Sequence, residues 1–285
     1  MSTKFHRKLA HLAMTFASLT TMTLSAGQSN PGPKLSEIII VGTVHKETQS
    51  FTSSDLLTIL KSVRPDVILC ELDSSFFTKE FKFEHLFGGL EEIAICEYMK
   101  TSPVMIRPYD IEGRNDFYRK NDTFNLEKQF FNKVSDLAGM KKLGTDSQEI
   151  LNQVRDCFKK RDVYLRATPR RINSFQCDEE VAQKWFAVDL GYAEIIRRTP
   201  ELRAFKDFQA NTRTFELQRN NAMVRNIVKF AQEFQGKRIL VVCGFEHRHY
   251  LRISLNFHQP SSFIVNEYWD YDENTHSAQN PTPTK

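Results

Sequence analysis

The chain contains no pair of cysteines at C-x-x-C spacing. Its 285 residues include five cysteines, an odd number, so at least one thiol is unpaired. Zinc ribbons and thioredoxin-like redox motifs both need that spacing, and the sequence therefore does not support either. Cys70 and Cys243 lie within apolar runs, which predicts small, buried core residues. Pairing among the other three cysteines stays open.

Outside the N-terminus, the sequence also has no apolar run long enough to span a bilayer. Residues 1–26 differ: Lys4, Arg7 and Lys8 precede a moderately apolar stretch, and Ser25 and Ala26 follow it. This pattern is typical of a secretory signal peptide cleaved near Ala26. It predicts an exported protein, periplasmic or secreted. A transit peptide or an uncleaved anchor is the alternative, and we expect membrane association only through this segment.

A concentrated basic footprint is missing as well. The formal net charge is +4, and three of these charges belong to the N-terminal segment. The rest of the chain is close to neutral, which argues against a nucleic-acid partner. Hydrophobic residues make up 40% of the chain and charged residues 26%, a composition typical of globular proteins.

The globular part begins with a strand, a helix and a second strand. Residues 27–36 contain two prolines and two glycines and are predicted to be a linker. A buried strand over 37–41 is followed by a helix, with its N-cap region at 52–55 and an apolar stripe over 56–63, and by a strand over 67–70. Together they have the size of a parallel β-α-β unit. We predict a single α/β domain over 37–269 and a disordered polar tail over 270–285.

The remaining elements place a helical insertion inside this domain. We expect a helix over 79–100 and a strand over 104–107, and then an insertion over about 112–235 without strands. Its helices are predicted near 125–143, 146–164 and 178–196, with a long helix from 199 to 234. A strand over 238–243, a helix over 248–257 and a strand over 262–268 complete the chain. The predicted fold is a mostly parallel sheet built from both chain ends.

One short pattern occurs twice, with about two hundred residues between the copies. Residues 38–41 run into Gly42-Thr43-Val44-His45, and residues 239–243 run into Gly244-Phe245-Glu246-His247. Each copy is a predicted strand, a glycine, two residues and a histidine. Because parallel strands place their carboxyl ends at one edge of a sheet, we expect His45 and His247 to meet there.

Carboxylates end two other predicted strands. Glu71 and Asp73 follow the second strand, and Asp110 follows the third. Two imidazoles and a carboxylate at one edge are suitable ligands for a divalent metal. The same groups are also suitable as a general base and the acid that orients it. The residues alone leave both alternatives open.

With these motifs the chain resembles the TraB/TIKI superfamily, which includes the GumN and PrgY proteins. The resemblance depends on the two Gly-x-x-His motifs, on residues 64–72 (RPDVILCEL), which end in a strand with a glutamate, and on residues 219–223 (RNNAM) in a predicted helix. All four motifs occur in the family's order. They cover about a third of the chain, and residues 112–200 match nothing in the family.

The resemblance implies a hydrolase, and for TIKI-type members a metal-dependent peptidase that uses Mn²⁺ or Co²⁺ on a peptide or protein substrate. It implies that His45, Glu71 and His247 hold the metal. Arg219 and Asn220 would reach the same centre from the helix, Arg219 as a clamp for an oxyanion or carboxylate and Asn220 to orient a water.

Two other functions remain open at this point. One is a metal-independent, esterase-like hydrolase in which a motif histidine is the general base. The other is a protein without catalytic activity that binds haem or a peptide through the same histidines.

Overall fold

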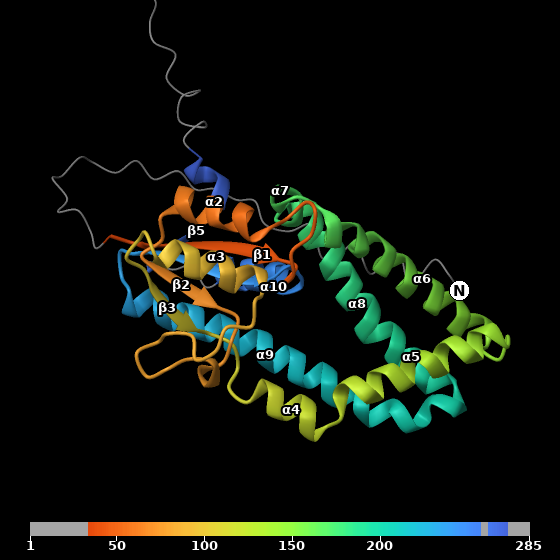
Figure 1. The fold of residues 1–285 in the computed structure, drawn as a ribbon. Helices are drawn as coiled ribbons and strands as arrows, with labels where there is room; N and C mark the ends of the chain where they lie inside the picture. Colours follow the sequence, from red (N-terminus) through yellow and green to blue (C-terminus); the bar gives the residue numbers. More distant parts are fainter. Residues whose placement is uncertain (1–33, 258–261, 273–285) are drawn as a thin grey trace, which may run out of the picture. The chain divides into compact units, whose positions relative to one another are not determined.

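The chain folds around a five-stranded sheet in which all strands are parallel, in the order β3-β2-β4-β1-β5. The computed structural model describes residues 34–257 and 262–272 (Figure 1). The predicted α/β class is confirmed. The predicted signal peptide, most of the predicted linker and residues 273–285 of the predicted tail lie outside the described residues.

Both ends of the chain contribute to the centre of this sheet. The strands are β1 (Ser36–Thr43), β2 (Val67–Cys70), β3 (Met105–Pro108), β4 (Arg238–Gly244) and β5 (Phe263–Asn266). β4 lies between β1 and β2, so a strand from late in the sequence pairs with the first two. β1 and β4 consist largely of isoleucine and valine, which suits strands that are covered on both faces.

Helices cover both faces of the sheet (Figure 1). α2 (Ser53–Val63) and α3 (Leu90–Met99) pack on one face, and α9 (Lys206–Glu233) and α10 (Phe245–Phe257) pack on the other. The alternation of side chains along β1 divides its residues between these two layers. Ile39 and Val41 belong to the first core, whereas Ile38 and Ile40 belong to the second.

The predicted insertion between β3 and β4 is helical and has a core of its own. It contains α4 (Arg114–Lys120), α5 (Thr123–Gly139), α6 (Thr145–Asp162), α7 (Pro169–Ile172) and α8 (Phe175–Arg198). A third hydrophobic cluster joins α5, α6 and α8 through Phe130, Val154, Tyr192 and Ile195, and Leu202 from the segment that follows α8 adds to it. A 3₁₀ segment (Pro200–Phe205) precedes α9, so the long helix predicted from 199 is interrupted near its start.

The helix predicted over 79–100 is wrong in its first half. Residues 79–89 lie in a loop with an isolated bridge between Phe77 and Phe83, and α3 begins only at Leu90. The cause is the Gly88-Gly89 pair. Gly88 has a φ of 72°, a left-handed conformation that a continuous helix through residues 79–100 could not contain. Two smaller differences are that α10 begins at Phe245 and that Tyr268–Tyr271 forms a 3₁₀ turn at the predicted domain end.

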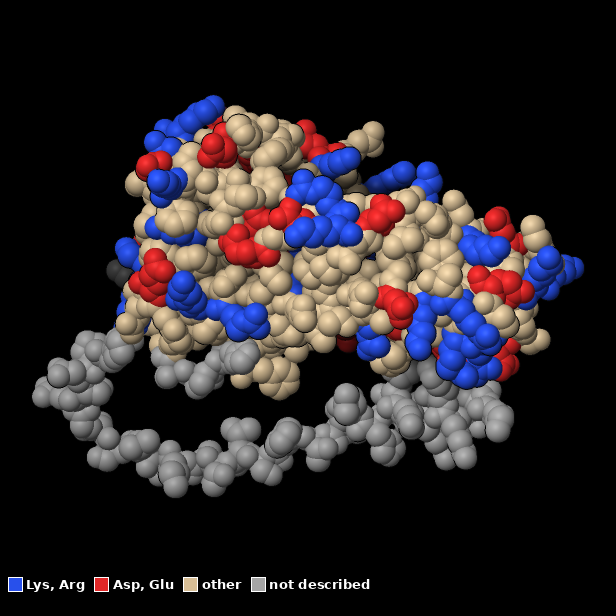
Figure 2. Space-filling view, turned by 90° about the horizontal axis from the view of Figure 1, so that it is seen from below, with Lys and Arg blue, Asp and Glu red and all other residues tan. Residues whose placement is uncertain are grey.

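Two predictions about partners concern membranes and nucleic acids. Of the helices in the described part of the chain, none is both long and apolar enough to cross a bilayer. On the face shown in Figure 2, Lys and Arg side chains alternate with Asp and Glu side chains. The expected absence of a nucleic-acid partner stays a prediction.

Candidate functional site

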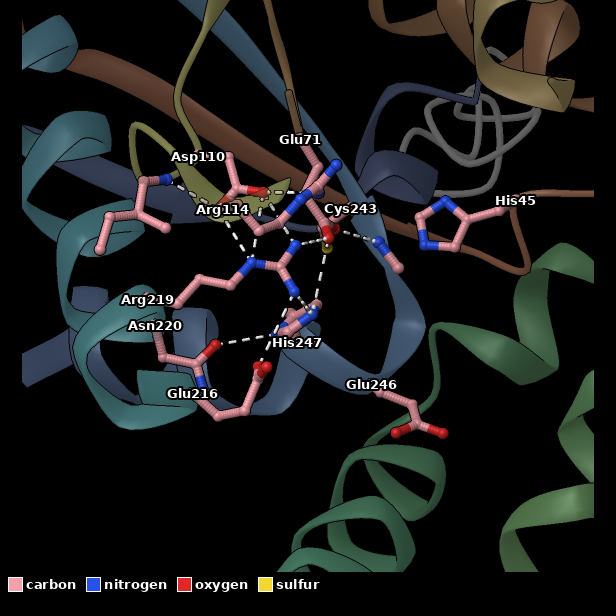
Figure 3. A network of polar contacts seen from close by, with 12 residues as sticks. His45, Glu71, Asp110, Arg114, Glu216, Arg219, Asn220, Cys243, Glu246 and His247 are labelled. Carbon is pink, nitrogen blue, oxygen red and sulfur yellow. Dashed lines mark hydrogen bonds and ion pairs between the residues drawn. The ribbon is translucent and has the colours of Figure 1, made fainter. Parts of the chain in front are cut away.

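The two Gly-x-x-His motifs lie side by side at the carboxyl edge of the sheet. In the parallel pairing of β1 with β4, Gly42 is opposite Cys243 and Thr43 is opposite Gly244. The chain therefore leaves both strands at the same level. Figure 3 shows His247 close to Glu71 and Arg219, with His45 to one side of them.

The first motif is fixed by a side chain from the helical insertion. Asn173, fully buried at the end of α7, accepts a hydrogen bond from the Gly42 amide at 2.7 Å and donates one to the Gly42 carbonyl at 3.0 Å. A Cβ on Gly42 would lie 3.0 Å from the Cα of Phe245. Glycine is therefore required here for the close approach of two backbones.

His45 forms a dyad with Glu91, the second residue of α3. Its Nδ1 lies 2.7 Å from Oε1 of Glu91, and the Thr43 hydroxyl donates to the same oxygen. Burial lowers the pKa of His45, but the hydrogen bond that its ring donates to Glu91 and the charges of Glu71 and Glu91 outweigh this effect and raise the pKa to about 9. The side chain is 57% exposed, so the imidazole is reachable from solvent.

The other ring nitrogen of His45 is available for chemistry. Within the described residues Nε2 has no hydrogen-bond partner, and it lies so close to Gly244 that a Cβ there would come within 2.5 Å. Glu91 fixes the ring through Nδ1, which leaves Nε2 to accept or donate a proton. A carboxylate that orients an imidazole in this way is the usual support for a general base.

His247 has a different environment and a different charge. Its Nδ1 donates to the side-chain oxygen of Asn220 at 2.8 Å, and its Nε2 accepts from Nη1 of Arg219 at 3.2 Å. Burial and the positive charge of Arg219 lower the pKa of His247, despite the nearby carboxylate of Glu71. This histidine is therefore neutral at pH 7, whereas His45 is protonated.

Arg219 is the centre of a buried charge cluster, which we define as Glu71, Asp110, Arg219 and His247. Nε of Arg219 donates to Asp110 at 2.9 Å and Nη2 donates to Glu71 at 2.5 Å. Burial lowers the pKa of Arg219, but the two carboxylates outweigh this effect and raise it above its usual value. The guanidinium therefore remains charged and pairs with both acids, and Arg114 supplies a second positive charge to Asp110 at 2.8 Å.

Glu71 connects this cluster to the second glycine. Its Oε2 accepts a hydrogen bond from the Gly244 amide at 2.6 Å. Burial raises the pKa of Glu71, but the charge that His247 carries in acid, the charges of Arg219 and His45, and the bond from Gly244 prevail and lower it to about 2. Glu71 is thus ionised at any physiological pH and accepts hydrogen bonds with both oxygens.

The residues predicted to hold a metal do not form a three-ligand site as they are placed. Both oxygens of Glu71 and both ring nitrogens of His247 have protein partners, and the Arg219 guanidinium lies between them. Within the described residues, no three His, Cys, Asp or Glu side chains are grouped as metal ligands. The positive charge that a metal would supply at Glu71 and His247 comes instead from Arg219. The predicted role of Mn²⁺ or Co²⁺ is not tested by these contacts.

Four of the five predicted site residues meet directly, and these are Glu71, Arg219, Asn220 and His247. The fifth, His45, approaches them across Gly244.

The other strand-end acids have separate positions. Asp110 joins the charge cluster, whereas Asp73 caps the turn that begins at Ser74. Glu246 lies away from the cluster (Figure 3) and pairs with Lys184 at 2.6 Å.

Sequence reasoning missed Glu91, because the helix predicted over 79–100 placed it in mid-helix. The signal that would have found it is Gly88-Gly89, directly before an apolar run. Such a pair marks a helix start at Leu90. It would have placed Glu91 in a first turn, where a carboxylate is favoured by the helix dipole.

Comparisons of the chain with protein-family models, with curated proteins and with solved structures gave no significant match. The resemblance to the TraB/TIKI superfamily therefore depends on the four motifs alone.

Proposed function

We propose that the protein is a hydrolase of peptide amide bonds in which His45 is the general base. The observation that carries the proposal is the Glu91–His45 dyad, with its 2.7 Å hydrogen bond and an Nε2 that has no partner within the described residues. The motif resemblance supports the reaction class, and a peptide or protein is the expected substrate.

In this mechanism Nε2 of His45 removes a proton from a water molecule as the water oxygen attacks the substrate carbonyl. The same nitrogen then donates that proton to the leaving amine as the C–N bond breaks. Glu91 keeps Nδ1 protonated and stabilises the imidazolium that forms between the two steps. No metal takes part in these steps.

The charge cluster has a positioning role in the proposal. The Nε, Nη1 and Nη2 atoms of Arg219 already have partners in Asp110, His247 and Glu71. Arg219 therefore fixes these side chains and does not itself contact the substrate. Glu71 in turn accepts a hydrogen bond from the Gly244 amide and so fixes Gly244 in place. The His45 ring lies against this glycine.

The dyad predicts an alkaline pH profile. Only neutral His45 can take a proton, and with a pKa of about 9 about 1% of it is neutral at pH 7. We expect kcat/KM for quenched-fluorescence peptides to rise about tenfold per pH unit and to level off near pH 9. Glu91→Gln removes the carboxylate that accepts a hydrogen bond from His45 and raises its pKa. The pH profile of this variant should therefore level off at a lower pH and at a lower kcat/KM.

A profile that falls as the pH rises, or one that Glu91→Gln leaves unchanged, would contradict this role of His45. The same assay tests the metal. Hydrolysis that is abolished by EDTA and restored by Mn²⁺ or Co²⁺ would replace our mechanism with the metal-dependent peptidase that the resemblance implies.

The two motif glycines predict opposite effects of an added methyl group. In Gly244→Ala the three atoms nearest the new Cβ all belong to the His45 ring, the closest being Nε2 at 2.5 Å. The ring must move, so we expect kcat/KM to fall about 100-fold with little loss of stability. In Gly42→Ala the Cβ meets the Phe245 backbone, and we expect a loss of about 1–3 kcal/mol. Urea unfolding and the peptide assay together separate the two effects, and equal effects in both variants would contradict the assignment.

A further inference from the structure

An apolar pocket opens beside the dyad and is not used by the mechanism above. It has a volume of about 240 Å³. Its apolar wall includes the rings of Phe76, Phe83 and Phe87. Its polar lining residues are His45, Glu71, Glu91, Glu92 and Arg114. A group bound in this pocket would therefore lie next to the proposed general base.

The aromatic wall is built by the loop over residues 74–89. Oε2 of Glu92 accepts hydrogen bonds from the backbone amides of Phe87 and Gly88, at 2.5 and 2.6 Å. The ring of Phe87 packs edge-on against Phe76, with ring centroids 5.1 Å apart. Glu92 is buried at the start of α3, so the loop is tied to the same helix that carries Glu91.

The size and lining of the pocket determine what it can hold. An apolar cavity of about 150 Å³ is enough for benzene, whereas sites for drug-sized ligands begin at about 300 Å³. The pocket lies between these limits and therefore has room for one large side chain. Its apolar wall offers no partner to a charged group, whose desolvation would then be uncompensated.

We propose that this pocket selects the substrate by binding an apolar side chain of phenylalanine or leucine size, next to the scissile amide bond. The inference rests on the proposed function, because it assigns the pocket to the same site. It concerns recognition only, and it can be measured without turnover.

The test is a titration of the full chain, followed by NMR chemical shifts, with three small amides. These probes are N-acetyl-phenylalaninamide, N-acetyl-glycinamide and N-acetyl-aspartamide. Burial of one aromatic side chain predicts that the phenylalanine probe binds at least about tenfold more tightly than the other two. Equal dissociation constants for the three probes would overturn the proposal.

Gly89 gives a variant that fills the pocket. It lines the pocket at the N-cap of α3 with an extended backbone, and a Cβ there would meet its nearest neighbours at 3.6 Å or more. We expect Gly89→Leu to weaken binding of the phenylalanine probe about tenfold. Gly144→Leu is the matched control, because Gly144 caps α6 with a similar backbone and nothing lies within 4 Å of its Cβ position.

A second variant removes part of the wall without affecting the core. The Phe87 side chain is exposed on the pocket rim, so Phe87→Ser should fold normally and weaken the phenylalanine probe several-fold. If both pocket variants bind this probe as the wild type does, the proposal is overturned, and a loss limited to these variants supports it.

Peptide hydrolysis separates this inference from the proposed function. If peptides with glycine beside the cleaved bond react as fast as those with phenylalanine, the pocket assignment fails and the hydrolase stands. If the phenylalanine probe binds selectively but no peptide is cleaved by wild type at pH 9, the hydrolase fails and the pocket assignment stands.

Discussion

Replacing His45 with alanine is expected to lower kcat/KM for peptide hydrolysis by about 10²–10⁴-fold, the contribution typical of a positioned general base. The side chain is more than half exposed and bonds only to Glu91 among the described side chains. Its removal therefore leaves the core packing unchanged. We expect the free energy of unfolding to change little. The lower kcat/KM would then result from the missing general base and not from unfolding.

The comparison that makes this result specific is a second exposed histidine. His85 lies in the loop over 74–89, is exposed and does not line the pocket. His85→Ala should keep full activity. A loss in His45→Ala of less than about tenfold, measured with unfolding curves that match the wild type, would remove His45 from the mechanism.

The largest expected effect on stability is that of Arg219→Met. Methionine keeps much of the volume but leaves the buried Glu71 without its arginine partner, and leaves Asp110 with Arg114 as its remaining cationic partner among the described residues. Loss of one partner from a buried ion pair typically costs about 3–5 kcal/mol. Urea unfolding at pH 7 measures this cost. Arg197→Met is the control, because Arg197 forms only an exposed pair with Glu194, and such pairs contribute about 0–1 kcal/mol.

The pH dependence gives this prediction a second readout. The pKa of Glu71 is lowered to about 2 in the folded protein, so its contribution is complete above the usual value near 4.5 and is lost as the pH falls towards 2. Without Arg219 this contribution is smaller. The stability difference between the wild type and Arg219→Met should therefore shrink between pH 4.5 and 2, and a constant difference would contradict the assignment.

The strands were predictable because their composition leaves few alternatives. The continuous isoleucine and valine run of β1 and its counterpart in β4 are typical of strands covered on both faces. The glycine and histidine that follow each run were then predicted to lie at one edge of the sheet, since the carboxyl ends of parallel strands lie together. The pairing itself could not be derived, because a register between residues so far apart depends on tertiary packing.

The site was predicted less completely than the fold. His247 and Glu71 were expected as metal ligands, but their positions relative to the Arg219 guanidinium depend on how α9 lies under the sheet. No local pattern encodes that geometry. Asn173 was missed for the same reason, since it contacts a motif residue from a different element, whereas Glu91 was missed because the start of its helix was predicted too early. Sequence periodicity identifies which residues are buried, but not which buried polar groups face one another.

The position of β4 has a consequence for synthesis of the chain. β4 separates β1 from β2 in the sheet, and residue 243 is made 200 residues after residue 43. At about 5–20 residues per second, the ribosome needs roughly 10–40 s to produce the strand that joins them. During that interval β1 and β2 lack the strand that lies between them, and each presents an unpaired edge with apolar side chains. Nascent chains in this state are the species that a chaperone would have to protect from aggregation.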